Sequence, residues 1–311
     1  MNLLCFNFIN IFKIACMKKS VNERFFFVIN PKSGNKSHDW ETIINAYFVH
    51  LHYKIELYFL TKNCNNHTIK ERLDAFEPSQ AIAIGGDGTV KLVAECIMQT
   101  SIVLGILPGG SANGLAKELG IPEDPIKALD VIVHGEIRKI HTTTVNDQLC
   151  VHLSDVGLNA YLMKKFESNG VRGMWGYMVA SIKVLLQNSL MDIEMLIDGK
   201  KIRTKAFMVV IANATMYGTG AVINPIGNLE DEYFEVIVIK QISFLEVFKM
   251  VISHQNYDEE KTKVYQTNSL TMKSRKKVHF QIDGEYMGKV NAVTANLVPD
   301  ALQVKVPKDK A

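Results

Sequence analysis

Short apolar runs rich in β-branched and aromatic residues alternate with amphipathic segments from Arg24 onward. The runs have the length of buried strands, and the segments between them repeat apolar residues at helical spacing. The predicted strands are 25–29, 55–60, a run that ends at Gly85, and 102–107. The predicted helices are 40–52, 68–76, 92–98 and 125–133. Strands separated by helices of this length predict parallel β-α-β units.

The pattern changes after about Thr142, where strand-like runs follow one another with turn residues such as Asp198-Gly199 between many of them. The predicted strands are 145–158, 192–197, 201–212, 234–239, 269–274, 278–282, 293–297 and 302–306. Helical spacing returns mainly at 175–187 and 244–252. This pattern predicts a mostly antiparallel, sandwich-like β domain.

We therefore expect an N-terminal extension and two domains: extension 1–21, α/β domain 22–141 and β domain 142–297, with 298–311 left open as a return to the first domain. Residues 1–16 are apolar, and Lys13 is their one charge. They are too short to span a bilayer, and no basic region precedes them as in a signal peptide. One interpretation is a misassigned start upstream of Met17, and the other is a short membrane-surface anchor.

Composition narrows the choice of partners. The 311 residues include 35 basic and 32 acidic side chains, with a net charge of +3, a balance that argues against nucleic acid. The run Lys273, Arg275, Lys276 and Lys277 is either a solvated strand end or a contact with an anionic membrane surface. The five cysteines are scattered without metal-ligand spacing, which fits a reduced cytoplasm better than a disulfide framework.

The stretch that ends the third predicted strand indicates phosphate binding. An apolar run breaks into Gly85-Gly86-Asp87-Gly88-Thr89, and we expect a helix to start after Thr89. Glycine lets the backbone approach a ligand closely, and a helix N-terminus offers unpaired N–H groups to an anion. A carboxylate such as Asp87 beside phosphates indicates Mg²⁺ between them. The alternative is that Asp87 only caps the helix.

Other predicted strands of the first domain end in similar turns. Polar or glycine-rich turns follow at Asn30–Gly34, at Thr61 and at Pro108–Asn113. Ligands of a parallel sheet gather at the carboxyl ends of its strands. We therefore expect all four turns to converge on one edge.

With these residues, the chain resembles the bacterial diacylglycerol kinase-like lipid kinases, which are related to sphingosine and ceramide kinases. The resemblance runs from about Phe25 to Pro307. It rests on Asn30-Pro-Lys-Ser-Gly34, Gly85-Gly-Asp-Gly-Thr89, Pro108-Gly-Gly-Ser-Ala-Asn113 and Asp283-Gly-Glu285, in this order. It implies a Rossmann-like α/β domain with a mostly parallel sheet and a β-sandwich C-terminal domain, as in NAD kinase and diacylglycerol kinase, with ATP bound in the cleft between them.

The resemblance also assigns residues to the nucleotide. Asp87 is expected to organise Mg²⁺, and Ser111 stands where many relatives have Thr. For Asn113 a turn-forming role and direct ligand contact both stay open. The implied ATP-binding residues are Asn30, Pro31, Lys32, Ser33, Gly34, Thr61, Gly85, Gly86, Asp87, Gly88, Thr89, Ser111 and Asn113.

The motif Asp283-Gly284-Glu285 follows the predicted strand 278–282. By itself Asp-Gly is a hairpin turn signal. The resemblance makes Glu285 the general base that takes the proton from the lipid hydroxyl, and Asp283 its metal-linked or positioning neighbour. The implied catalytic residues are Glu285, Asp87 and Asp283, and transfer requires Asp87 and Glu285 to face one crevice.

A structural Mg²⁺ site is implied at Asp231, with Asn228 and Tyr233 contributing backbone carbonyls. Glu232 stands where relatives have Gly, and a bulky residue adopts φ > 0 only at a cost. The alternative is an acidic hairpin loop. Further departures are Lys91-Leu92 in place of Asn-Glu, and Gly114 and Lys117 in place of Asp and Arg.

The function implied is an ATP- and Mg²⁺-dependent kinase that phosphorylates a hydroxyl of diacylglycerol or a similar membrane lipid. The alternatives are a sphingoid-base or ceramide kinase, an NAD kinase-like enzyme, or a non-catalytic nucleotide- or lipid-binding regulator. The apolar segment 173–186 is either core packing or an acyl-chain wall. We expect a cytoplasmic protein, peripheral at the inner membrane surface, without nucleic acid; a homodimer stays open.

Overall fold

The structure is a computed structural model that describes residues 23–34, 38–62, 64–157, 160, 190–216, 222–241 and 258–308. It divides into two compact units, Met1–Arg138 with Leu302–Ala311, and Lys139–Ala301. The expectations for residues 1–16, 173–187 and 244–252 lie outside the described residues. Within the described ranges, no helix has the length and apolar character needed to cross a bilayer.

The first unit is built on a parallel sheet with the strand order β2-β1-β3-β4-β14. Phe25, Phe26 and Phe27 of β1 are fully buried, so the central strand has apolar side chains on both faces, as expected for a sheet covered on both sides. Only the C-terminal end of β14 belongs to this parallel sheet, where Gln303 pairs with Val103 of β4. The strands are β1 (Arg24–Ile29), β2 (Lys54–Phe59), β3 (Gln80–Gly85), β4 (Val103–Pro108) and β14 (Glu285–Val306).

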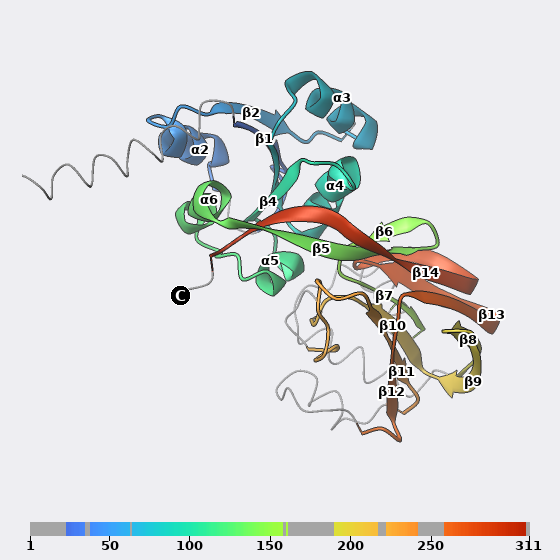
Figure 1. Ribbon diagram of the computed structural model, residues 1–311. Coiled ribbons are helices and arrows are strands. Elements are labelled where there is room, and N and C mark those ends of the chain that lie inside the picture. The colour runs from blue at the N-terminus through green and yellow to red at the C-terminus, as the bar shows by residue number, and fades with distance from the viewer. Residues whose placement is uncertain are drawn as a thin grey trace, which may run out of the picture. The chain divides into compact units, whose positions relative to one another are not determined.

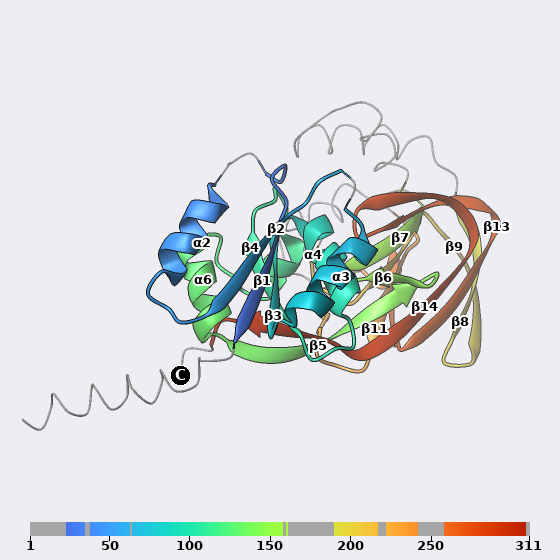
Figure 2. The ribbon, with the colours of Figure 1, turned by 90° about the horizontal axis from the view of Figure 1, so that it is seen from above.

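Helices cover both faces of this sheet. Figure 2 shows α2 and α6 on one face and α3 and α4 on the other, in agreement with the packing of each pair. Asn65 and Asp124 cap α3 and α6 by accepting backbone N–H bonds, which fixes where the helices begin. The helices are α2 (Trp40–Phe48), α3 (Asn66–Phe76), α4 (Asp87–Ile97), α5 (Gly114–Glu118) and α6 (Pro125–His134).

The second unit is antiparallel in its described strand pairs. One ladder runs β12-β11-β10-β7-β13, and the other end of β13 pairs with β8, which pairs with β9 (Figure 1). Residues such as Met195, Phe234 and Phe280 form its buried core. Its further strands are β5 (Glu136–Val145), β6 (Gln148–Cys150), β7 (Leu153–Gly157), β8 (Met191–Ile197), β9 (Lys200–Ala206), β10 (Met208–Ala212), β11 (Phe234–Ile239), β12 (Thr262–Thr267) and β13 (Ser269–Ile282).

Two-residue turns set the register of three hairpins. Asn146-Asp147, Asp198-Gly199 and Asp283-Gly284 all have positive φ at both positions and join directly paired strand ends. Such turns match the twist of the flanking strands, and they favour Asn, Asp and Gly because these residues tolerate the left-handed region. The parallel first domain and the antiparallel second domain confirm the predicted fold class.

Several predicted boundaries are wrong for local reasons. α4 begins at Asp87 rather than after Thr89, because the carbonyl of Gly86 already accepts the N–H groups of Thr89 and Val90. The predicted strand 145–158 is divided by the turn Asn146-Asp147 into β5, which begins at Glu136, and the later strands β6 and β7. The predicted strand 201–212 is likewise two strands, β9 and β10.

Other differences arise from pairing with distant strands. The gap predicted at 275–277 does not end β13, which continues through an irregularity in its register with β14. β14 is one strand of 22 residues, where two short strands are predicted. The pattern also missed β12 and the short helix α5.

Candidate active site

Three loops of the first unit leave the carboxyl ends of neighbouring strands and are bonded to one another. Asn30, after β1, donates its backbone N–H to the carbonyl of Ile84 at 3.0 Å. Gly109, after β4, donates to the carbonyl of Gly85 at 2.9 Å. The loops after β1, β3 and β4 therefore begin at one edge of the sheet, where a parallel fold places its ligands.

Glycines allow these loops to touch through their backbones. A Cβ built on Gly110 would lie 2.4 Å from the Cα of Gly86, and one on Gly34 would lie 2.2 Å from the oxygen of Gly109. Gly34 also has φ +74°, which disfavours other residues. The glycine contact is defined as Gly34, Gly85, Gly86, Gly109 and Gly110. It leaves no room for a side chain at Gly34 or Gly110 and little room at Gly86 and Gly109.

Asn30 fastens the first loop to the start of α4. Its Nδ2 donates to Thr89 Oγ1 at 3.2 Å, while its Oδ1 accepts from the backbone N–H of Lys32 at 3.1 Å. Ser33 Oγ donates to the Asn30 carbonyl at 2.9 Å. Pro31 and Lys32 are exposed beside these bonds. The loop is therefore held by its Asn and Ser while its lysine faces solvent.

Asp87 is the first residue of α4 but does not act as its N-cap. That position belongs to Gly86, which is extended and provides no side-chain cap. Asp87 Oδ1 instead accepts the backbone N–H of Leu115, in α5, at 3.2 Å. Its Oδ2 has no hydrogen bond within the described part of the chain, so one carboxylate oxygen remains for a ligand beside the exposed Gly88.

Asn113 turns its side chain back into its own loop. Its Oδ1 accepts from the Gly110 N–H at 2.8 Å, and its Nδ2 donates to the Gly110 carbonyl at 2.9 Å. Asn113 is buried with φ 52°, a conformation that Asn tolerates better than most residues. These bonds favour the turn-forming interpretation of Asn113, whereas the neighbouring Ser111 is exposed.

Thr61 lies just after β2, next along the same edge, since Leu60 donates to the Ile29 carbonyl at 2.8 Å. Its described hydrogen bonds go to Cys64 rather than to the glycine contact. The hydroxyl and backbone N–H of Thr61 lie 3.3 and 3.2 Å from Cys64 Sγ. The hydrogen bond from the Thr61 hydroxyl, with further ones from its N–H and Tyr58, lowers the pKa of the Cys64 thiol.

In the second unit, Asp283 anchors the turn that precedes Glu285. Its Oδ1 accepts from the His152 N–H at 2.9 Å, and its Oδ2 accepts from the Val151 N–H at 3.1 Å. Its own N–H donates to the Leu153 carbonyl at 2.9 Å. Both carboxylate oxygens thus serve the connection between β6 and β7. Asp283 positions the hairpin, and Glu285, the first residue of β14, is exposed.

Two buried polar residues behind this turn were missed in the sequence. Gln281 Oε1 accepts from the Gly284 N–H at 2.7 Å, and Gln281 Nε2 donates to Asp155 Oδ2 at 2.6 Å. Asp155 Oδ1 accepts from the Ala160 N–H at 3.0 Å. Asp155 is fully buried in the middle of the buried strand β7, and an acidic residue inside a predicted strand was the available signal.

The loop proposed to hold a structural metal closes through local hydrogen bonds. Asp231 Oδ1 accepts from the Tyr233 N–H at 3.1 Å, and the Asn228 carbonyl accepts from the Asp231 N–H at 3.5 Å. Glu232 is not among the described residues with positive φ, so the bulk of its side chain does not strain the loop. The loop therefore tolerates Glu at this position.

Glu235, which directly follows this loop in β11, is a buried carboxylate that the sequence did not single out. It accepts from Asn224 Nδ2 at 2.5 Å and from Gln266 Nε2 at 3.1 Å. Burial raises its pKa, Asp231 adds to the rise, and the two amide bonds oppose it. Glu235 ties the strands β11 and β12 to the loop at Asn224.

Comparison with known proteins identifies both parts of the chain. The family model of the diacylglycerol kinase catalytic domain matches residues 24–145, and that of the YegS C-terminal NAD kinase beta sandwich-like domain matches residues 155–306. A diacylglycerol kinase of Bacillus subtilis is 26% identical over 74% of this chain and 78% of its own length. A YegS-like lipid kinase of Chromohalobacter salexigens is 28% identical over 75% of this chain and 78% of its own length.

The fold is also found among solved structures. A diacylglycerol kinase from Bacillus anthracis superposes with a TM-score of 0.69 over 91% of this chain and 97% of its own, at 17% identity. The domain that contains the glycine contact is thus of the kinase class. The two matches together show that the chain belongs to the diacylglycerol kinase-like family of lipid kinases, which confirms the resemblance inferred from its motifs.

Adding a methyl group at the glycine contact tests its role. In Gly110→Ala the new Cβ meets backbone at Gly86, so the loops after β3 and β4 must separate. We expect kcat/KM for ATP to fall by roughly 100-fold, the loss typical of a 1 Å misplacement. ATP binding, measured by calorimetry, should weaken with it.

Gly120→Ala is the matched control, because nothing lies within 4 Å of its Cβ. Its φ of +67° makes the substitution cost about 1–2 kcal/mol of stability without moving the loops. Equal loss of ATP binding in both variants would show that the glycine contact has no special role.

Replacing the anchoring carboxylate tests the turn in the second unit. Asn tolerates the left-handed φ of Asp283, so Asp283→Asn keeps the turn but replaces one charged acceptor with an amide N–H donor. The Val151 or His152 N–H then loses its partner. We expect a loss of about 1–3 kcal/mol in the free energy of unfolding, measured with urea. An unchanged unfolding midpoint would contradict the anchoring role.

Proposed function

We propose that this lipid kinase transfers the γ-phosphate of ATP to a hydroxyl of diacylglycerol or of a similar membrane lipid. The observation that carries the proposal is the glycine contact, where three strand-end loops meet at backbone distance beside Asp87. Phosphoryl transfer needs phosphates that are held still and neutralised, with a base near the acceptor hydroxyl. Residues of this chain can perform each of these tasks.

The loops of the glycine contact hold the phosphates of ATP. With few side chains in the way, the phosphates can approach the loop backbone, and the first turn of α4 offers its N–H groups and the positive end of its dipole. The exposed side chains of Lys32, Ser111 and Thr61 lie on loops at the same edge of the sheet. They supply a positive charge and two hydroxyl groups to the nucleotide.

Mg²⁺ fits this donor set through Asp87. One oxygen of Asp87 is used by Leu115 N–H, which fixes the orientation of the carboxylate, and the other is left for the ion. The described residues contain no cluster of three His, Cys, Asp or Glu side chains that could hold a metal. The remaining ligands would be phosphate oxygens and water, as is usual for Mg²⁺ on nucleotides. When bound, the ion neutralises phosphate charge.

Glu285 is the general base that takes the proton from the lipid hydroxyl. Its carboxylate is exposed at the start of β14, and its position is set by the bonds of Asp283 and Gln281 to the preceding turn. The carboxylate of Glu285 is therefore accessible to the substrate hydroxyl, while hydrogen bonds fix the turn that precedes it. The hydroxyl that Glu285 deprotonates is the group that attacks the γ-phosphate.

Two further assignments belong to this proposal. A structural Mg²⁺ would be held by Asp231 together with the backbone carbonyls of Asn228 and Tyr233, in the loop that precedes Glu235. The lipid is reached from the membrane surface, where the enzyme makes peripheral contact.

One assay tests the substrate class. Labelled ATP with Mg²⁺ is incubated with diacylglycerol, ceramide, a sphingoid base and NAD. Phosphorylated diacylglycerol is the expected product. A phosphorylated sphingolipid moves the enzyme to the related kinases, and phosphorylated NAD contradicts the lipid acceptor. ATP binding without any product would indicate a regulator.

Glu285→Gln tests the base. The amide keeps the shape of the side chain but cannot accept the proton, so we expect kcat to fall by roughly 10²- to 10⁴-fold with ATP binding retained. Glu260→Gln, which removes another exposed carboxylate of the second unit, is the control and should be fully active. Near-normal turnover of Glu285→Gln would exclude the assigned role.

Asp87→Asn tests the metal site. An asparagine oxygen can still accept the Leu115 N–H, so the fold should persist while the charge for Mg²⁺ is lost. We expect turnover to fall by roughly 100-fold or more, and more Mg²⁺ to be needed for half-maximal activity. The Mg²⁺ titration separates this effect from simple loop damage. A wild-type Mg²⁺ profile in the variant would disprove the assignment.

A further inference from the structure

A basic face lies on the second unit and contains none of the residues assigned above. It is formed by the antiparallel strands β9, β8 and β13, in this order. Residues directly opposite on neighbouring strands point to the same side of a sheet. The outward side chains are Asp192, Glu194 and Leu196 of β8, Lys201, Arg203 and Lys205 of β9, and Thr271, Lys273 and Arg275 of β13.

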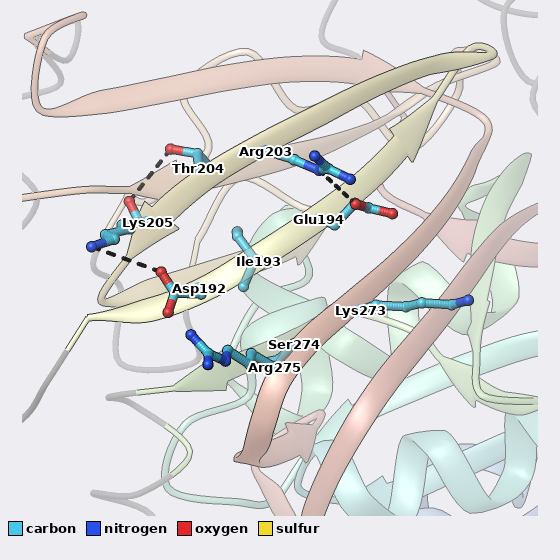
Figure 3. Close-up of a pocket in the computed structure, with 9 residues that line it drawn as sticks. All are labelled: Asp192, Ile193, Glu194, Arg203, Thr204, Lys205, Lys273, Ser274 and Arg275. Atoms are coloured by element: carbon cyan, nitrogen blue, oxygen red, sulfur yellow. Dashed lines mark hydrogen bonds and ion pairs between the residues drawn. The ribbon is translucent and has the colours of Figure 1, made fainter.

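This face is hollowed. A cavity of about 610 Å³ is lined by residues of all three strands (Figure 3). Its lining includes Arg203, Lys205, Lys273 and Arg275 against two carboxylates. Positive charge therefore exceeds negative charge in a recess that an anionic group can enter.

The two carboxylates, Asp192 and Glu194, form ion pairs with the cations of β9. Glu194 Oε1 lies 2.7 Å from Lys201 Nζ, and its Oε2 lies 2.8 Å from Arg203 Nε. Both hydrogen bonds lower the pKa of Glu194, so its carboxylate stays ionised. Asp192 lies 3.9 Å from Lys205. Figure 3 draws these contacts for Arg203 and Lys205 and none for Lys273 or Arg275. Among the described residues, these two cations of β13 form no ion pair.

More charge follows along β13. Lys276 and Lys277 are exposed in the irregular stretch where Lys273 pairs with Ala292 but Val278 already pairs with Val290. The four residues 274–277 therefore stand opposite a single residue of β14. A bulge of this kind turns side chains away from the ladder and presents them to solvent.

An exposed leucine is set among these cations. Leu196 is 48% exposed and stands directly opposite Lys201 on β9 and Thr271 on β13. An apolar side chain flanked by Lys and Arg suits the boundary between lipid headgroups and acyl chains. Nucleic acid fits less well, because the cavity lining contains no aromatic side chain on which bases could stack.

We propose that this basic face, Lys201, Arg203, Lys205, Lys273, Arg275 and Leu196, docks the protein on an anionic lipid bilayer. The cations bind lipid phosphates in and around the cavity, and Leu196 enters the headgroup region. The inference rests on the proposed function only in that it names where the membrane contact is made. Binding to vesicles requires neither ATP nor transfer, so either idea can fail without the other.

The test measures binding of the full chain to vesicles by co-sedimentation, without ATP. Vesicles of phosphatidylglycerol and phosphatidylcholine in equal parts are compared with pure phosphatidylcholine. The wild type should bind the anionic vesicles, more weakly at higher salt. Each cation near such a surface contributes about fivefold to affinity, so the double variant Lys273→Ala with Arg275→Ala should bind roughly 25-fold more weakly.

The matched control is Lys70→Ala with Lys127→Ala, which removes the same charge from exposed positions on α3 and α6 of the first unit. It should bind like the wild type. Leu196→Ser should weaken the binding that persists at high salt, and urea unfolding of each variant checks that the fold is kept.

Three results would overturn the docking surface. The first is equal binding of the wild type to both kinds of vesicle. The second is equal loss in the two double variants, which would mean that only net charge matters. The third is a β13 double variant that binds vesicles normally but loses affinity for a DNA oligonucleotide, which would assign the face to nucleic acid.

Discussion

Contact between backbones at the carboxyl ends of β1, β3 and β4 is the constraint on which the rest of the candidate active site depends. A Cβ on Gly34 would collide with the backbone of Gly109, and a Cβ on Gly110 would collide with that of Gly86, so the loops can meet only with glycine at positions 34 and 110. Once they meet, Asn30 and Thr89 can bond across them, and Asp87 can reach the start of α5. The assembly of the site therefore depends on glycines that allow close backbone contact as well as on the side chains of Asn30 and Asp87, which bond across the loops.

In the second unit, the carboxylate of Asp283 fixes a turn, and the carboxylate of Glu285 two residues later stays exposed. Asp283 uses both oxygens on the backbone between β6 and β7, and Gln281 links the turn to the buried Asp155. Buried polar groups are costly unless they are bonded. Such a network therefore holds the turn in one geometry, and the exposed Glu285 inherits a defined position at the start of β14.

The pattern of apolar and polar residues predicted most strands correctly, but it often placed the ends of the strands wrongly. The run 25–29 and the Gly85 turn were predictable, because strand composition and glycine punctuation depend on neighbours in the chain. The length of β14 and the continuity of β13 were not, because each is decided by partners far away in sequence, such as Val103 for Gln303. Asp155 was missed because its partner Gln281 is 126 positions away in sequence, and only the fold brings the two side chains together.

By itself the sequence determined most of the order of strands and helices, the position of every glycine that the loops require, and the family of lipid kinases to which the chain belongs. Only the tertiary structure decided what the polar residues do: Asn113 closes its own loop, Asp87 accepts the Leu115 N–H at the start of α5, and Asp283 anchors a backbone segment about 130 positions away. It also brought Lys273 beside Glu194 on one basic face. The physical reason is that hydrogen bonds and charges act over a few ångströms of space, whatever the distance along the chain.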